Sequence, residues 1–144
     1  MAKQKYGLNA GRHASRDCLV RALYQWQIAE SSEAELLAQF ESDGSLARAD
    51  PGYFALVLHH CVASAEELDQ VIQRFADRSM QQLDAVGRSI LLIAMVEFVH
   101  CVDVPAKVAI NEAVDLAKRY GATDSYKFIN AVLDKAAQEL RSGA

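Results

Sequence analysis

Basic and aromatic side chains flank Gly121 on both sides, and they are the most suggestive candidates for chemistry in this chain. Six of them lie within eight residues of the glycine: Lys118, Arg119, Tyr120, Tyr126, Lys127 and Phe128. Cations bind phosphates, and aromatic rings can stack on the bases of single-stranded RNA. Phe128 also fits the apolar stripe of a helix, so a place in the core is the alternative to RNA contact.

Other potential reactive groups favour a binding protein over an enzyme. Glu112 and Asp115 lie three residues apart and would share one helix face, where a pair can do acid–base work but is more often salt-bridged. His59 and His60 are adjacent, so a helix points them about 100° apart, a poor arrangement for one metal ion. The sequence has no GxxxxGK[ST], GxSxG or HExxH motif. We therefore predict no catalytic residue, no metal and no cofactor.

Charge is distributed unevenly along the 144 residues, whose formal net charge is −4. Residues 1–25 carry five basic side chains against one acidic one, whereas residues 26–103 carry four against thirteen. Screening limits electrostatic attraction to about 10 Å, so local charge decides where a polyanion docks. The basic N-terminal arm, about residues 1–11, is expected to be flexible, and it is a candidate phosphate contact. An ordinary solvated tail is the alternative.

Composition is that of a globular domain, with 51% hydrophobic and 24% charged residues. The longest apolar run, residues 90–96, is too short to cross a bilayer, and the N-terminus does not resemble a signal peptide. We therefore expect a cytoplasmic protein without membrane contact. Cys18, Cys61 and Cys101 are scattered and odd in number, which favours reduced, buried thiols over a zinc site or disulfides.

Hydrophobic periodicity predicts an all-α domain of about seven helices, because no segment alternates as a strand does. Helix starts are expected at Ser15, Ser32, Asp50, Ser64, Asp84, Pro105 and Asp124 or Ser125. The segment 86–98 is apolar on nearly every side and belongs at the centre of a bundle. We expect the core to include Ile90, Ile93, Ala94, Val114, Ala117, Val132 and Leu133. The loop at residues 41–49 and the turn near residues 76–79 are possible subdomain boundaries, and the second would divide the chain into helical subdomains at about 12–78 and 79–141.

The C-terminal third resembles a known family. Residues 104–128, VPAKVAINEAVDLAKRYGATDSYKF, and the continuation INAVL look like the signature of the NusB family of bacterial transcription antitermination factors. The patterns RHASR at 12–16 and LYQW at 23–26, and the segment 50–58, resemble the same family, so the resemblance spans nearly the whole chain. Leu92 and Ala131 depart from it, standing where arginine and glycine are common.

This resemblance implies seven helices in two small bundles, either as a monomer or as a homodimer. It also implies binding of boxA RNA in ribosomal RNA leader transcripts, together with the ribosomal protein NusE, within the antitermination complex of RNA polymerase. The matching positions for RNA contact are Arg12, Arg16, Tyr120, Asp124, Lys127 and Phe128. Tyr24 matches a position that contacts either RNA or the protein partner.

Two other functions remain open from the sequence. The same helical module forms the N-terminal domain of some rRNA cytosine methyltransferases, whose catalytic domain binds S-adenosylmethionine. The sequence ends at Ala144 without a glycine-rich cofactor loop, so we expect no such activity if it is complete. A helical adaptor that binds only proteins is the third possibility, and an RNA-binding assay with and without the ribosomal partner would distinguish it.

Overall fold

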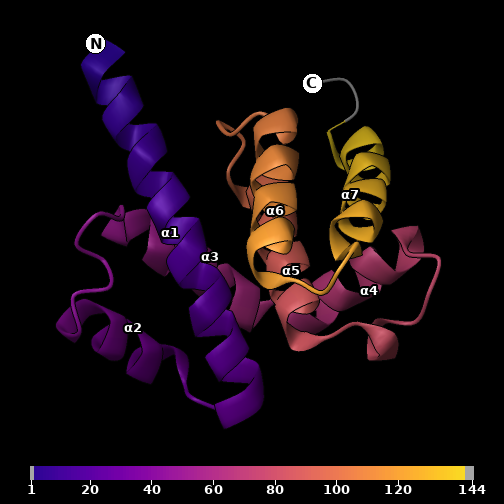
Figure 1. Cartoon of the computed structure of the whole chain (residues 1–144), viewed down its shortest axis with the longest axis horizontal. Helices are drawn as coiled ribbons and strands as arrows, with labels where there is room; N and C mark the ends of the chain where they lie inside the picture. The colour runs from indigo at the N-terminus through magenta and orange to yellow at the C-terminus, as the bar shows by residue number, and fades with distance from the viewer. Residues whose placement is uncertain (1, 142–144) are drawn as a thin grey trace.

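The computed structural model describes residues 2–141, with the side chains of residues 9–79 and 81–141. This range forms seven α-helices and one short 3₁₀ helix, and none of it is strand (Figure 1). The elements are α1 (Ala2–Ala29), α2 (Glu33–Ser42), α3 (Pro51–Ala63), α4 (Ala65–Phe75), η1 (Met80–Gln82), α5 (Ala85–His100), α6 (Ala106–Tyr120) and α7 (Ser125–Leu140). The predicted all-α fold is confirmed.

Three of the expected helix caps are present. The Ser32 side chain accepts a hydrogen bond from the Glu35 amide at 3.1 Å, and the Glu35 carboxylate accepts one from the Ser32 amide, which completes a capping box. Asp50 and Asp84 accept hydrogen bonds from amides in the first turns of α3 and α5. A helix also starts directly after Ser64, as expected, but the Ser64 side chain makes no capping hydrogen bond.

The first helix begins at Ala2 and not at Ser15 as predicted, so residues 2–11 are helical and the expected flexible arm is wrong there. Its first turns extend beyond the other helices (Figure 1). Ser15 is buried, and its hydroxyl accepts a hydrogen bond from the Asp50 amide while lying 2.8 Å from the Asp50 carbonyl. The same amide donates to the carbonyl of Gly11. Ser15 therefore joins the middle of α1 to the start of α3 instead of capping a helix.

Helix α5 is the centre of the fold, as its apolar sequence predicts. Residues 89–98 are all buried, and the helix packs against α1, α3, α4, α6 and α7. Buried residues of all seven helices form one hydrophobic cluster. Every expected core residue belongs to it except Val114, which is half-buried while its neighbour Ala113 is buried. The division into subdomains near residue 78 stays a prediction.

The three cysteines are free and buried, as expected. His60 is half-buried, and its ring stacks on that of His100 with 3.8 Å between the centroids. Among the described residues, no helix combines the length and the apolar character that crossing a membrane requires.

Candidate nucleic-acid interface

Arg16 lies in the interior and not on the basic surface where the sequence placed it. Its side chain is 4% exposed, and its Nε donates a 2.8 Å hydrogen bond to Glu97 of α5. A second nitrogen donates to Glu112 of α6 at 3.2 Å, and the hydroxyl of Tyr53 donates to Glu97. Burial raises the pKa of the Glu97 carboxyl, against the opposing effect of Arg16. Arg16 therefore joins α1 to the core, and no part of its guanidinium is presented to a phosphate.

Arg12 lies one helical turn before Arg16 and is half-buried. Its guanidinium donates to Asp103 at 2.8 Å, which holds the pKa of that carboxyl below its usual value. It also lies over the Tyr53 ring, 4.6 Å from the centroid. The side chain is 18% exposed, so only its edge remains open to solvent. Arg12 is thus the one predicted arginine that reaches the surface.

The corner between α6 and α7 presents its predicted residues in two directions. Tyr120 faces α1, because its hydroxyl donates a 2.5 Å hydrogen bond to Asp17, which raises the pKa of the phenol. The neighbouring Arg119 also binds Asp17, at 2.8 Å. Phe128 instead faces the connection between α4 and α5, where the guanidinium of Arg78 lies 4.3 Å from its ring centroid. The structure does not bring Tyr120 and Phe128 into one pocket.

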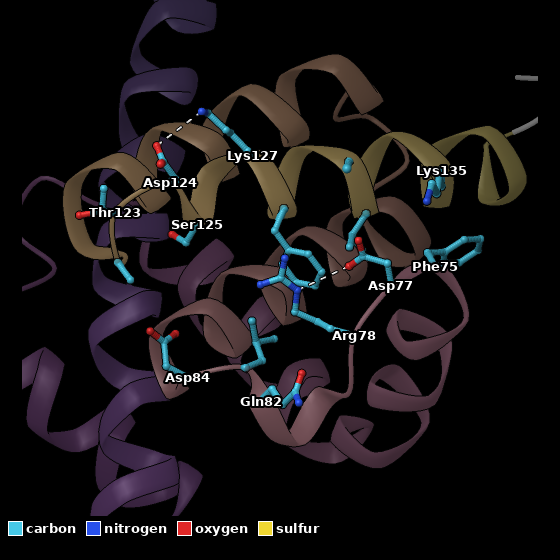
Figure 2. A pocket seen from close by; sticks show the side chains of 15 residues that line it. Phe75, Asp77, Arg78, Gln82, Asp84, Thr123, Asp124, Ser125, Lys127 and Lys135 are labelled. Atoms are coloured by element: carbon cyan, nitrogen blue, oxygen red, sulfur yellow. Dashed lines mark hydrogen bonds and ion pairs between the residues drawn. The ribbon is translucent and has the colours of Figure 1, made fainter.

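A cavity of about 560 Å³ lies between the first half of α7 and residues 75–84, with Phe128 in its wall. Figure 2 shows Lys127 and Asp124 paired at its rim, with 3.6 Å between the amine and the carboxylate. Lys135 also lines it. Phe128 is half-buried: one part of its ring packs against the core, and another part lines the cavity. The place in the core and the exposed face for RNA contact, which the sequence left as alternatives, are therefore compatible. No motif in the sequence pointed to Arg78, which belongs to a connection fifty residues earlier in the chain.

Asp124 does not cap α7, although it occupies the N-cap position. Its backbone is left-handed, with φ 65°, and its side chain accepts no hydrogen bond from the first turn. A capping side chain needs an extended backbone at this position to reach the amides. The helix starts at Ser125, as predicted, but the cap by Asp124 is wrong, and the hydroxyl of Ser125, the alternative, has no hydrogen-bond partner among the described residues. The carboxylate is exposed and has only Lys127 as an ion-pair partner among the described residues.

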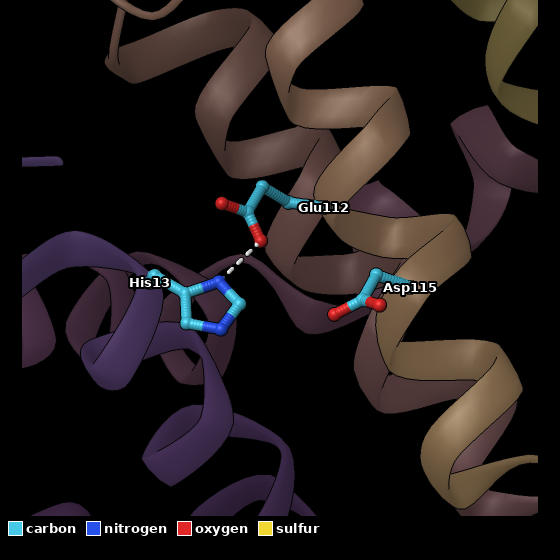
Figure 3. Close-up of side chains that lie close together, drawn as sticks. All are labelled: His13, Glu112 and Asp115. Carbon is cyan, nitrogen blue, oxygen red and sulfur yellow. Dashed lines mark hydrogen bonds and ion pairs between the residues drawn. The ribbon is translucent and has the colours of Figure 1, made fainter. Parts of the chain in front are cut away.

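Both carboxylates of the predicted pair take part in salt bridges, and Figure 3 shows Glu112 facing His13. Glu112 binds both Arg16 and His13, with 2.8 Å between its oxygen and the His13 Nδ1, and Asp115 binds Arg119 at 3.2 Å. One ligand atom from each of His13, Glu112 and Asp115 lies within 4.8 Å of the others, so the three could surround a metal ion. The two arginines already offset the carboxylate charges, which favours an ion-pair network over a cation site.

Comparison with known proteins decides the family. A model of the NusB family matches residues 13–138. The chain belongs to the NusB family. The transcription antitermination protein NusB of Pectobacterium carotovorum is 45% identical over 134 residues, which cover 93% of this chain and 96% of that relative. The NusB protein of Sodalis glossinidius is 41% identical over 132 residues, or 92% of this chain and 95% of the relative.

Solved structures agree with the NusB assignment. NusB of T. maritima has a TM-score of 0.78 at 28% identity, over 89% of this chain and 91% of that one. A chain in a structure described as "Crystal Structure of a Plectonemic RNA Supercoil" has a TM-score of 0.75 over 92% of this chain and 97% of that one. The second chain is 22% identical, so that likeness shows the NusB-like fold alone. The family predicted from the C-terminal motif is confirmed.

We expect Arg16→Ala to destabilise the protein strongly. Removing the arginine leaves Glu97 buried without a cationic partner, which should cost about 3–5 kcal/mol of unfolding free energy. Urea denaturation followed by circular dichroism measures it. Arg12→Ala is the control, because its partner Asp103 is mostly exposed, and it should cost much less. Equal stability of the Arg16 and Arg12 variants would contradict the assigned role.

Proposed function

We propose that this chain is a transcription antitermination factor that binds boxA-type RNA of ribosomal RNA leaders together with the ribosomal protein NusE. Family membership supports the class of function. The observation that supports RNA binding is the cavity beside α7. Its wall holds the Phe128 ring with the Arg78 guanidinium stacked over it, and Lys127 lies at its rim. The proposal assigns no catalytic residue and no cofactor.

The cavity has the chemistry of a site for single-stranded RNA. A base can stack on an aromatic ring or on the plane of an arginine guanidinium, and this wall offers both. Lys127 is 66% exposed and can meet a phosphate near the stacked base. Arg78 is exposed and pairs only loosely with Asp77, at 3.5 Å, so it can move aside as a base enters.

Asp124 places a negative charge at this rim, beside the positive charge of Lys127. An exposed carboxylate repels a phosphate chain unless it accepts a hydrogen bond from a base. Because it makes no capping bond, its side chain is available for either role. We assign it as a brake on RNA affinity or as a reader of one base.

The remaining predicted residues take different parts in the proposal. Arg12 keeps an exposed edge and contacts a phosphate. Arg16 acts through Glu97 and Glu112, and we propose it as a positioning residue that does not itself touch RNA. Tyr24 is 45% exposed on α1, one turn before Ile28, which is 62% exposed. The exposed apolar surface of Tyr24 and Ile28 is better suited to contact with the protein partner than with RNA. Tyr120 is also partly exposed, and the edge of its ring is free to contact RNA.

The direct test is a titration of boxA-type RNA with and without NusE. A net charge of −4 predicts modest RNA affinity for the chain alone, and a basic ribosomal protein beside it should extend the positive surface. We expect NusE to tighten RNA binding, and RNA must then tighten NusE binding by the same factor. Equal RNA affinity in both titrations would refute the coupling. NusE binding without any RNA binding would indicate a protein adaptor.

We expect Phe128→Leu to weaken RNA binding with little effect on the melting temperature. Leucine keeps the apolar packing but removes the aromatic face, whose stacking on a base is worth about 1–3 kcal/mol. Fluorescence anisotropy with boxA-type RNA and a thermal melt measure the two effects. A variant that loses melting temperature but keeps its RNA affinity would show that Phe128 is only a core residue.

Asp124→Asn should leave stability unchanged, since no capping bond is lost and asparagine tolerates the left-handed backbone. If the carboxylate mainly repels phosphate, the variant binds cognate and scrambled RNA more tightly. If it reads a base donor, binding to the cognate RNA weakens more than binding to the scrambled one. Wild-type affinity for both RNAs would remove Asp124 from the interface.

A further inference from the structure

A second hollow, separate from the Phe128 cavity, lies on the α1 side of the α6–α7 corner. It has a volume of about 430 Å³ and is walled by α1, the loop between α2 and α3, and the end of α6. Each of these elements contributes one arginine, respectively Arg21, Arg48 and Arg119. None of the three is among the positions matched to the family's RNA contacts, although Arg119 lies within the motif at residues 104–128.

Asp17, in the floor of this hollow, holds two of the arginines in place. Its two oxygens bind Arg119 at 2.8 Å and Arg21 at 3.6 Å. Among the described residues that line the hollow, Asp17 is the only acidic one, so three guanidinium groups share the lining with one carboxylate. Asp115 pairs with Arg119 at 3.2 Å, and Asp43 interacts with Arg21, so these two neighbouring carboxylates offset a further part of the charge. The side chains that line the hollow still carry more positive than negative charge.

The loop that carries Arg48 is fastened to α1. The Cys18 thiol donates to the carbonyl of Ser45 at 3.3 Å, and the Ser45 amide donates to Asp43 at 2.9 Å. Gly44 has φ 81°, a backbone that permits this turn. Arg48 is exposed and forms no ion pair with any described side chain. The backbone of Arg48 is therefore held beside the hollow, while its guanidinium is exposed and has no ion-pair partner among the described side chains.

We propose that this hollow, defined by Arg21, Arg48 and Arg119, is a phosphate-binding site that takes the RNA backbone. Guanidinium groups match phosphate oxygens with paired hydrogen bonds, and three of them converge here from different elements. Asp17 also binds Tyr120, so the hollow is continuous with the corner assigned to RNA above. An RNA strand bound at that corner therefore continues across α1 toward the α2–α3 loop. The inference rests on the proposed RNA-binding function.

Arg48→Gln tests the site, because Arg48 is exposed and its loss breaks no contact among the described residues. Affinity for a single-stranded boxA-type RNA is measured against salt concentration, with NusE present throughout. Losing one phosphate contact should lower the slope of log affinity against log salt by about 0.7, which corresponds to roughly fivefold weaker binding at about 0.1 M salt. Arg48→Lys should retain most of the slope because it retains the charge.

Arg74→Gln is the matched control, since it removes the same charge from α4, where Arg74 pairs with Glu139 outside this hollow. It should leave both affinity and slope close to those of the wild type. If Arg48→Gln behaves like this control while the wild type binds RNA, the phosphate site is overturned and the proposed function stands. If the wild type binds no RNA, the proposed function and this inference fall together.

Discussion

The buried pair of Arg16 and Glu97 is the constraint on which the rest of the structure depends. It places a cation of α1 against an anion of the central helix, where both are almost without solvent. Two charges in such a place are tolerable only when their other hydrogen bonds are satisfied, and Tyr53 and Glu112 provide them. The network therefore fixes α1, α3, α5 and α6 relative to one another.

That constraint positions the surface proposed for RNA. Asp17 follows Arg16 directly and lies on the next face of α1, where it binds Tyr120, Arg119 and Arg21. One turn of α1 thus carries two networks. The buried one around Arg16 holds the helix against the core, and the exposed one around Asp17 positions two arginines and the Tyr120 ring. Side chains held in this way lose less conformational entropy when a ligand binds. The proposed RNA surface is accordingly preorganised on the α1 side and looser at Arg78.

Local signals in the sequence predicted most of the fold, because they depend on neighbours along the chain. The caps at Ser32, Asp50 and Asp84 and the apolar run of α5 are of this kind. Tertiary partners were not predictable: Glu97 lies 81 residues from Arg16, and the sequence offers no rule that pairs them. Arg16 was therefore assigned to the surface with the other bases of the N-terminal region.

The candidate site was predicted in part, for a similar reason. The motif around Gly121 located the corner, but the left-handed backbone of Asp124 depends on how α6 and α7 meet. Arg78 and Arg48 come from connections without a motif, and only folding brings them beside Phe128 and Arg119.

The most direct test of the proposed RNA surface is to map RNA contacts by the amide chemical shifts of the labelled protein as boxA-type RNA is added with NusE. Relative to the NusE complex alone, the account predicts changes in residues 118–128 and near residues 12–21, 48 and 78. Changes confined to α2, the start of α3 or the end of α7 would contradict it.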